Sequence, residues 1–238
     1  MAKHSKEEWK TYENVFDQFT LRNLNYLENK GYFENLKSAL GVGKEANVFI
    51  AEKEDGERII VKIYRLENCN FNKMFQYLKA DPRFPSIKPR RREIIFAWTL
   101  REYRNLLVAR QAGARVPTVF FNKFNILIEE FIGVDSVAPK LKDFIFNSDK
   151  EVLLMFEEII EQMKILWEKA EIVHADLSEF NILVAESKPV LIDFSQSTSV
   201  KDFHSKEYLE RDLKNICRFF KKQGLDKDPD VLIKKFLS

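Results

Sequence analysis

The chain has 238 residues, of which 45% are hydrophobic and 32% charged. These fractions are typical of a soluble globular protein that is long enough to bury a substantial core. Its 39 basic and 37 acidic side chains leave a net charge of +2, so bulk charge indicates no particular partner. The two cysteines, Cys69 and Cys217, lie far apart without a metal-ligand spacing, which gives no support to a disulfide scaffold or a zinc site.

The N-terminal residues lack the apolar core of a signal peptide. No stretch approaches the roughly 20 apolar residues that span a bilayer. We therefore expect a cytoplasmic protein with no membrane partner.

The first part of the chain reads as a helical extension, which we place at residues 1–38. Thr20 is the expected N-cap and Gly31 the expected end of one helix. The apolar face of that helix is formed by Leu21, Leu24, Tyr26 and Leu27.

Residues 39–132 have the texture of an antiparallel sheet with one main helix. Strands are predicted over residues 47–52 and 58–64, joined by a hairpin at Asp55-Gly56, and again over 116–121 and 125–131. Residues 68–89 contain three prolines and scattered charges, which predict a long mobile loop.

A helix is predicted from Arg90 to about Gln111 because apolar residues recur at helical spacing. This stripe consists of Ile95, Trp98, Leu106 and Ala109, and Glu102 falls inside it. A glutamate that faces a core needs a cation.

Near Gly133 the pattern changes from strands to helices, so residues 133–238 form a second, mostly helical lobe. Ser148 and Glu151 form a capping-box pattern before a long helix. Two short strands are predicted around a turn at Ser187-Lys188, followed by helices over 206–223 and 229–237.

The strongest chemical signal is the segment HADLSEFN, residues 174–181, followed after a short hairpin by LIDFS, residues 191–195. Phosphoryl transfer needs a divalent metal on the phosphates and an oriented nucleophile. Asn181 and Asp193 offer hard oxygen ligands suited to Mg²⁺, and Asp176 can orient the nucleophile or accept its proton. Taken singly, each would be an ordinary loop residue; their ordered spacing favours the catalytic interpretation.

Lys62 is a polar residue inside an apolar strand. By itself it reads as a lysine at the edge of a sheet. Glu102 changes the interpretation, because each residue supplies the counter-charge that the other needs, and the pair can present the ammonium to phosphates. Glu93 precedes the apolar stripe and is a weaker candidate for this partner.

Two further segments allow either a purely structural or a functional interpretation. The loop GVGKEANVF contains Gly41 and Gly43 but completes no phosphate-binding motif, so a simple turn is an equal alternative. The run KPRRRE contains Arg90, Arg91 and Arg92, which form either a solvated charge run or a contact for RNA or an acidic protein.

These residues resemble the RIO family of atypical protein kinases, in particular its first, RIO kinase 1-like subfamily, with an archaeal source. Six ordered segments carry the resemblance over nearly the whole chain: GKEANVF, VKIYR, REYRNL, EEFIG, HADLSEFN and IDFSQS. The resemblance implies a two-lobed α+β protein-kinase-like fold with a truncated C-terminal lobe. It also implies ATP with Mg²⁺ or Mn²⁺ as cofactors, serine autophosphorylation, and a role in maturation of the small ribosomal subunit through contacts with its precursor RNA and proteins.

Residue by residue, the resemblance makes Lys62 the phosphate lysine, Glu102 its partner, Asp176 the catalytic acid, and Asn181 and Asp193 the metal ligands. The hinge that binds adenine through backbone groups would contain Glu130 and Ile132. The phosphates would be covered by Gly41, Val42, Gly43, Lys44, Glu45, Ala46, Asn47 and Val48.

The chain departs from conventional protein kinases after Asp193. Phe194-Ser195 replaces Phe-Gly, and only 45 residues follow, with no Ala-Pro-Glu segment. Three functions stay open: a serine kinase, for which Ser86 is the candidate autophosphorylation site; an ATPase switch in ribosome assembly that phosphorylates Asp193; and a small-molecule kinase of the aminoglycoside or choline type.

Overall fold

The computed structural model describes residues 16–43, 45–67 and 69–237. The chain forms two compact units. The first holds residues 16–78, 86–100 and 119–131, and the second holds 79–85, 101–118 and 132–237. Within the described ranges, no helix is long and apolar enough to cross a membrane.

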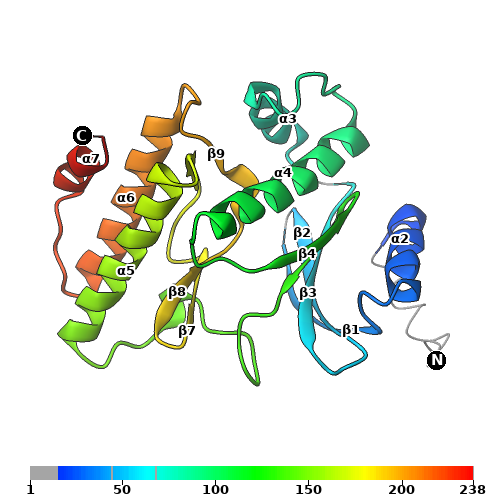
Figure 1. The fold of residues 1–238 in the computed structure, drawn as a ribbon, viewed down its shortest axis with the longest axis horizontal. Coiled ribbons are helices and arrows are strands. Elements are labelled where there is room, and N and C mark those ends of the chain that lie inside the picture. Colours follow the sequence, from blue (N-terminus) through cyan, green and yellow to red (C-terminus); the bar gives the residue numbers. More distant parts are fainter. Residues whose placement is uncertain (1–15, 44, 68, 238) are drawn as a thin grey trace. The chain divides into compact units, whose positions relative to one another are not determined.

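The first unit is built on a five-stranded antiparallel sheet with the order β1-β2-β3-β5-β4 (Figure 1). Its strands are β1 (Asn35–Val42), β2 (Ala46–Glu52), β3 (Arg58–Tyr64), β4 (Val119–Lys123) and β5 (Ile126–Glu130). The strands expected from the sequence are confirmed, and so is the hairpin at Gly56, which has a φ of 83°. β3 is the central strand, which decides the environment of Lys62.

Strand β1 was missed, because the expected helical extension ran to residue 38. Register shifts between Leu36 and Ser38 and between Ala39 and Gly41 break the alternation that identifies a strand. As an edge strand it also buries only Leu36 among residues 35–41, so its apolar signal is weak.

Helix α2 (Gln18–Asn29) confirms the helical part of the extension; residues 1–15 lie outside the described ranges. Its N-cap is Asp17 and not Thr20, because the Asp17 carboxylate accepts hydrogen bonds from the N–H groups of Phe19 and Thr20 at 3.0 and 3.2 Å. As expected, Gly31 follows the end of the helix, with a φ of 76°.

The apolar face of α2 packs into the core of the first unit. Leu21, Leu24 and Leu27 are buried there together with Ile59 and Val61 of β3. Tyr26 is 43% exposed, so its assignment to that face was wrong.

The loop expected over residues 68–89 contains helix α3 (Phe71–Ala80). All three prolines follow this helix, and its buried residues Met74 and Leu78 are one turn apart, a pattern too short to stand out. The next expected helix is confirmed as α4 (Arg91–Gln111), which begins in the first unit and ends in the second. All members of its predicted stripe are buried, Glu102 completely.

The second unit contains long helices and short hairpins. Its helices are α5 (Asp149–Glu168), α6 (Ser205–Lys222) and α7 (Pro229–Leu237), its strands are β6 (Ile172–Val173), β7 (Ile182–Ala185), β8 (Lys188–Leu191) and β9 (Thr198–Ser199), and its 3₁₀ turns are η1 (Leu141–Asp143) and η2 (Phe194–Gln196). Helices α5 and α6 lie side by side, with the rings of Phe156 and Phe220 5.3 Å apart (Figure 1).

Two local predictions for this unit need refinement. Ser148 caps α5 as expected, by accepting a hydrogen bond from the Glu151 N–H at 3.2 Å. The Glu151 carboxylate, however, reaches back to the N–H of Asn147 at 2.7 Å. The β7–β8 turn consists of Glu186 and Ser187, one residue earlier than predicted, and both have a positive φ as a two-residue hairpin loop requires.

Candidate active site

The loop between β6 and β7 carries Asp176 and ends at Asn181. The Asn181 side chain folds back onto this loop, where its Nδ2 donates a hydrogen bond to the backbone oxygen of Asp176 at 2.8 Å. Its amide oxygen is the end of the side chain that can bind a cation. The loop therefore fixes the predicted metal ligand against the predicted catalytic acid.

Asp193 is brought to the same place by the β7–β8 hairpin. Ile182 pairs with Leu191, and the N–H of Ile192 donates to the backbone oxygen of Asn181 at 3.0 Å. Asp193 has φ 63° and ψ 69°, a left-handed conformation that is uncommon outside glycine. The hydroxyl of Ser195 donates to its Oδ1 at 2.8 Å.

Asp212 of α6 is a part of the site that sequence reasoning missed. Its buried carboxylate accepts hydrogen bonds from the backbone N–H groups of Ala175 at 2.8 Å and Leu177 at 3.0 Å. Burial raises the pKa of Asp212 to about 7, against the opposing effect of these two hydrogen bonds and of Arg211. An acid between Leu209 and Leu213 on an apolar helix face is the same signal that identified Glu102.

Two neighbours of Asp212 on α6 hold the carbonyl groups of the same loop. The Arg211 guanidinium donates to the backbone oxygen of Ala175. Asn215 Nδ2 donates to the backbone oxygen of Leu177 at 3.1 Å. Helix α6 therefore fixes the peptide groups on both sides of Asp176.

His174 supports the loop by hydrogen bonding. Its Nε2 bonds to the backbone oxygen of Ile192 at 3.0 Å, and its ring centroid lies 4.6 Å from that of Phe194. Burial lowers the pKa of His174 to about 4, so the ring is neutral near pH 7. A neutral, buried imidazole bound to a carbonyl is suited to structure and not to acid–base catalysis.

In the first unit, Lys62 lies in the central strand β3, opposite Val48 of β2 and Leu127 of β5. The alternative of a lysine at the edge of the sheet is therefore wrong. Glu93 pairs with Arg90 at 3.1 Å. The pairing of Lys62 with Glu102 stays a prediction, as do the adenine contacts of Glu130 and Ile132.

The glycine-containing loop is a tight turn between β1 and β2. Gly41 and Val42 end β1, Ala46, Asn47 and Val48 begin β2, and the Gly43 N–H donates to the backbone oxygen of Ala46 at 2.9 Å. The Asn47 side chain is buried and accepts two hydrogen bonds from Arg65, at 3.1 and 3.2 Å. Lys44 lies outside the described residues.

The basic run at the start of α4 makes contacts within the first unit. Arg90 pairs with Glu93. The Arg91 guanidinium lies 5.0 Å from the ring centroid of Phe71, and that of Arg92 lies 5.3 Å from the ring centroid of Phe19. Ser86 is exposed nearby in the sequence.

The donor set at the site suits Mg²⁺, which prefers carboxylate and amide oxygens and keeps other positions for phosphates and water. Asp193 supplies a carboxylate and Asn181 an amide oxygen. Over the residues that the structure describes, no group of three or more His, Cys, Asp or Glu side chains forms an all-protein metal cage. A metal shared between two protein ligands and a nucleotide fits this arrangement.

The pattern described as the RIO domain matches residues 47–232 of this chain. The chain belongs to the RIO family. It is 41% identical to the "RIO-type serine/threonine-protein kinase Rio1" of Methanocaldococcus jannaschii over 92% of this chain and 74% of that protein. It is 35% identical to the protein of the same name from Haloferax volcanii, over 95% and 77%. These relatives support the Rio1-like subfamily.

Among solved structures, the chain resembles the Rio2 kinase of Chaetomium thermophilum in complex with ADP, Mg²⁺ and phosphoaspartate. The TM-score is 0.67 at 20% sequence identity, and the match covers 89% of this chain and 64% of that one. At this identity the likeness concerns the fold, and it confirms the expected α+β protein-kinase-like fold.

Proposed function

We propose that this RIO protein is an ATP- and Mg²⁺-dependent serine/threonine protein kinase that phosphorylates itself. The observation that carries the proposal is that hydrogen bonds to the backbone hold the segments of Asp176 and Asn181, while Ser195 donates its hydroxyl to Asp193. Relatives over most of the chain carry the serine/threonine kinase name.

Each residue of the set has a distinct role in the proposed reaction. Asp176, whose flanking peptide groups are fixed, orients the acceptor hydroxyl and takes its proton. Asn181 and Asp193 hold Mg²⁺, which when bound neutralises charge on the phosphates; Mn²⁺ can replace it. Lys62, in the central strand, binds the phosphates.

A second function uses the same residues, with Asp193 as the phosphate acceptor. The similar Rio2 kinase was captured with a phosphoaspartate, and a carboxylate that binds the metal is well placed to attack the terminal phosphate. In this case the chain acts as an ATPase switch with little kinase activity toward proteins.

Single-turnover assays with labelled ATP test these two functions. Wild type should become labelled and Asp176→Ala should not; equal labelling of both proteins would contradict the kinase proposal. A label that survives hydroxylamine and disappears in Ser86→Ala identifies that serine as the acceptor. A label that hydroxylamine removes and Asp193→Ala abolishes identifies the switch.

We also propose that the protein works in the cytoplasm on precursors of the small ribosomal subunit. The supports are the RIO family membership and the Arg90, Arg91 and Arg92 run. Because phosphate contacts weaken with salt, binding to precursor particles should fall steeply with salt concentration, and the triple change of these arginines to Gln should flatten that dependence. Binding that changes neither with salt concentration nor on substitution of the arginines would contradict a contact between these arginines and the particle.

A further inference from the structure

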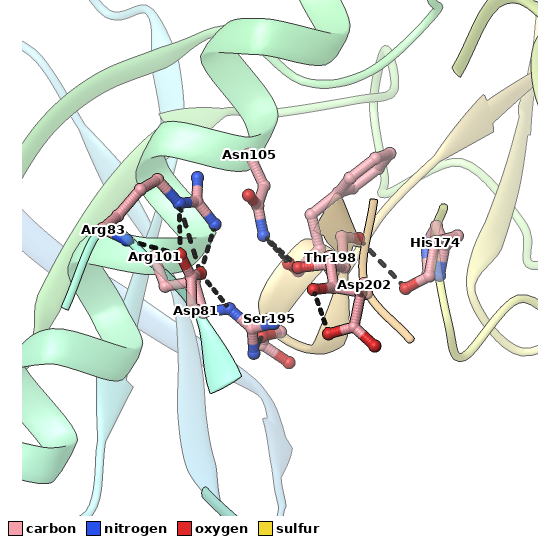
Figure 2. Close-up of polar contacts among 10 residues, drawn as sticks. Asp81, Arg83, Arg101, Asn105, His174, Ser195, Thr198 and Asp202 are labelled. Atoms are coloured by element: carbon pink, nitrogen blue, oxygen red, sulfur yellow. Dashed lines mark hydrogen bonds and ion pairs between the residues drawn. The ribbon is translucent and has the colours of Figure 1, made fainter. Parts of the chain in front are cut away.

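Arg101 and Asp81 form a buried ion pair behind the loop that carries Asp193. The Arg101 side chain is fully buried, and its Nε donates to Asp81 Oδ2 at 3.1 Å. Its Nη1 donates to the backbone oxygen of Ser195 at 3.3 Å (Figure 2). Arg101 therefore connects the segment that follows α3 with the turn after Asp193.

Asp81 is held firmly enough to orient Arg101. It is 3% exposed, and Arg83 binds it with its backbone N–H at 3.0 Å, its Nε at 2.9 Å and its Nη2 at 2.6 Å. Burial disfavours the charge, but the hydrogen bonds of Arg83 and the charges of Arg83 and Arg101 outweigh it and lower the pKa of Asp81. The carboxylate is thus ionised and pairs with two guanidinium groups.

The turn after Asp193 depends on these contacts from α4. Asn105 Nδ2 donates to the backbone oxygens of Phe194 at 2.9 Å and Ser197 at 2.8 Å, and Arg101 holds the oxygen of Ser195 between them. Ser195 in turn donates its hydroxyl to Asp193 Oδ1. A left-handed conformation of a non-glycine residue persists only where its surroundings enforce it, and this clamp is the enforcement at Asp193.

We propose that Asp81 and Arg101 are positioning residues that hold the Asp193 loop in its metal-binding form, so that the segment after α3 sets the metal affinity of the site. The metal part of this inference rests on the proposed function, in which Asp193 binds Mg²⁺. Both act through Ser195: Asp81 orients Arg101, Arg101 holds the backbone oxygen of Ser195, and Ser195 donates its hydroxyl to Asp193. A purely structural ion pair would support folding but would leave the metal dependence of nucleotide binding unchanged.

Two variants and one control test the proposal in the full chain. Asp81→Asn removes the charge that orients Arg101. Arg101→Lys keeps the charge beside Asp81, but an ammonium group cannot bind Asp81 and the Ser195 oxygen together as the forked guanidinium does. This second variant still tests the proposal if Asp81→Asn does not fold. The matched control is Arg104→Gln, an exposed position on the same helix, where the guanidinium lies over the ring of Phe84.

The first readout is hydrogen exchange of the backbone amides of residues 194–197 without nucleotide or metal. We expect at least tenfold faster exchange in Asp81→Asn and Arg101→Lys and no change in Arg104→Gln. The second is binding of a non-hydrolysable ATP analogue with and without Mg²⁺. We expect the Mg²⁺ concentration for half-maximal enhancement to rise about fivefold to tenfold in the two variants, with metal-free binding unchanged.

Unchanged exchange in both variants would overturn the proposal, and so would faster exchange with an unaltered Mg²⁺ requirement. If the affinity of the wild type for the ATP analogue does not depend on Mg²⁺, the proposed function and the metal part of this inference are both overturned. In that case the exchange result still decides whether Asp81 and Arg101 position the loop, so the two failures are distinguishable.

Discussion

The carboxylate of Asp212 holds the backbone on both sides of Asp176. It accepts hydrogen bonds from the N–H groups of Ala175 at 2.8 Å and Leu177 at 3.0 Å. Ala175 has a φ of 66°, so the chain needs this support to adopt the loop conformation. A catalytic acid is effective only where its backbone is held in the productive geometry.

Asp212→Asn is therefore expected to impair both activity and stability. The amide has one acceptor oxygen, so its NH2 group would face one of the two backbone donors and leave that N–H unsatisfied. We expect a loss of about 1–3 kcal/mol in the free energy of unfolding and about a 10- to 100-fold loss in kcat. Urea unfolding and initial rates measure these effects. Asp226→Asn, an exposed partner of Lys221, is the matched control and should change neither; equal behaviour of the two variants would contradict the role of Asp212.

The stability of the protein should depend on pH through two buried groups with opposite effects. Burial raises the pKa of Asp212 from 3.8 to about 7, so its contribution is present below pH 4 and is lost as the pH rises through about 7. Burial lowers the pKa of His174 from 6.5 to about 4, so the unfolded chain binds more protons between these values and the contribution of His174 is lost as the pH falls from 6.5 to 4.

In the wild type these two dependences oppose each other between pH 4 and 6.5. Asp212→Asn removes the dependence due to Asp212. In this variant the free energy of unfolding should therefore fall by on the order of 3 kcal/mol as the pH is lowered over this range, because the effect of His174 is no longer compensated. Urea unfolding at intervals between pH 4.5 and 7 checks this. Parallel curves for the variant and the wild type would show that the two groups are not titrating in this way.

The sequence predicted where Asp176, Asn181 and Asp193 lie in the fold, because they stand in ordered motifs next to predictable strands. The Asn181 and Asp193 segments and the buried position of Glu102 follow from spacing and periodicity alone. Asp212 and Arg101 were missed, although both interrupt apolar helix faces. Their partners are backbone groups of residues distant in the sequence, and a pattern along one helix does not reveal which loop packs against it.

The elements of the fold that were not predicted from the sequence were missed for a similar reason. Helix α3 was hidden by the prolines that follow it, and β1 by bulges and exposure. Asp81 directly follows α3 inside the segment expected to be a mobile loop, yet it is among the most buried charged residues described. Tertiary ion pairs of this kind leave no local signal in the sequence.

The two glycines of the β1–β2 turn should respond differently to substitution. A Cβ on Gly41 would meet nothing within 4 Å, whereas a Cβ on Gly43 would lie 2.8 Å from the backbone oxygen of Ala46. Gly43→Ala must therefore open the turn, and if the turn covers the phosphates we expect ATP affinity to fall about tenfold or more, with a change below about twofold for Gly41→Ala. Calorimetric titration with ATP measures both. An unchanged affinity in Gly43→Ala would favour the interpretation of the loop as a simple turn.

Asn181→Asp separates the two uses of the Asn181 side chain. The carboxylate would be a stronger ligand for Mg²⁺, but it has no N–H to donate to the backbone oxygen of Asp176, which the present side chain contacts at 2.8 Å. It would also place a negative charge beside Asp176. If the hydrogen bond to the catalytic loop dominates, kcat should fall at least about 100-fold while the Mg²⁺ requirement falls or stays constant.

Initial rates over a range of Mg²⁺ concentrations distinguish these effects for Asn181→Asp. The control is Asn122→Asp in β4, where the side chain bonds only locally to Ile126, and it should retain the wild-type kcat. Near-normal kcat in Asn181→Asp would show that metal binding is the sole use of this position. A kcat that recovers at high Mg²⁺ would likewise contradict the positioning of Asp176 by Asn181, because added metal cannot restore a hydrogen bond to the loop.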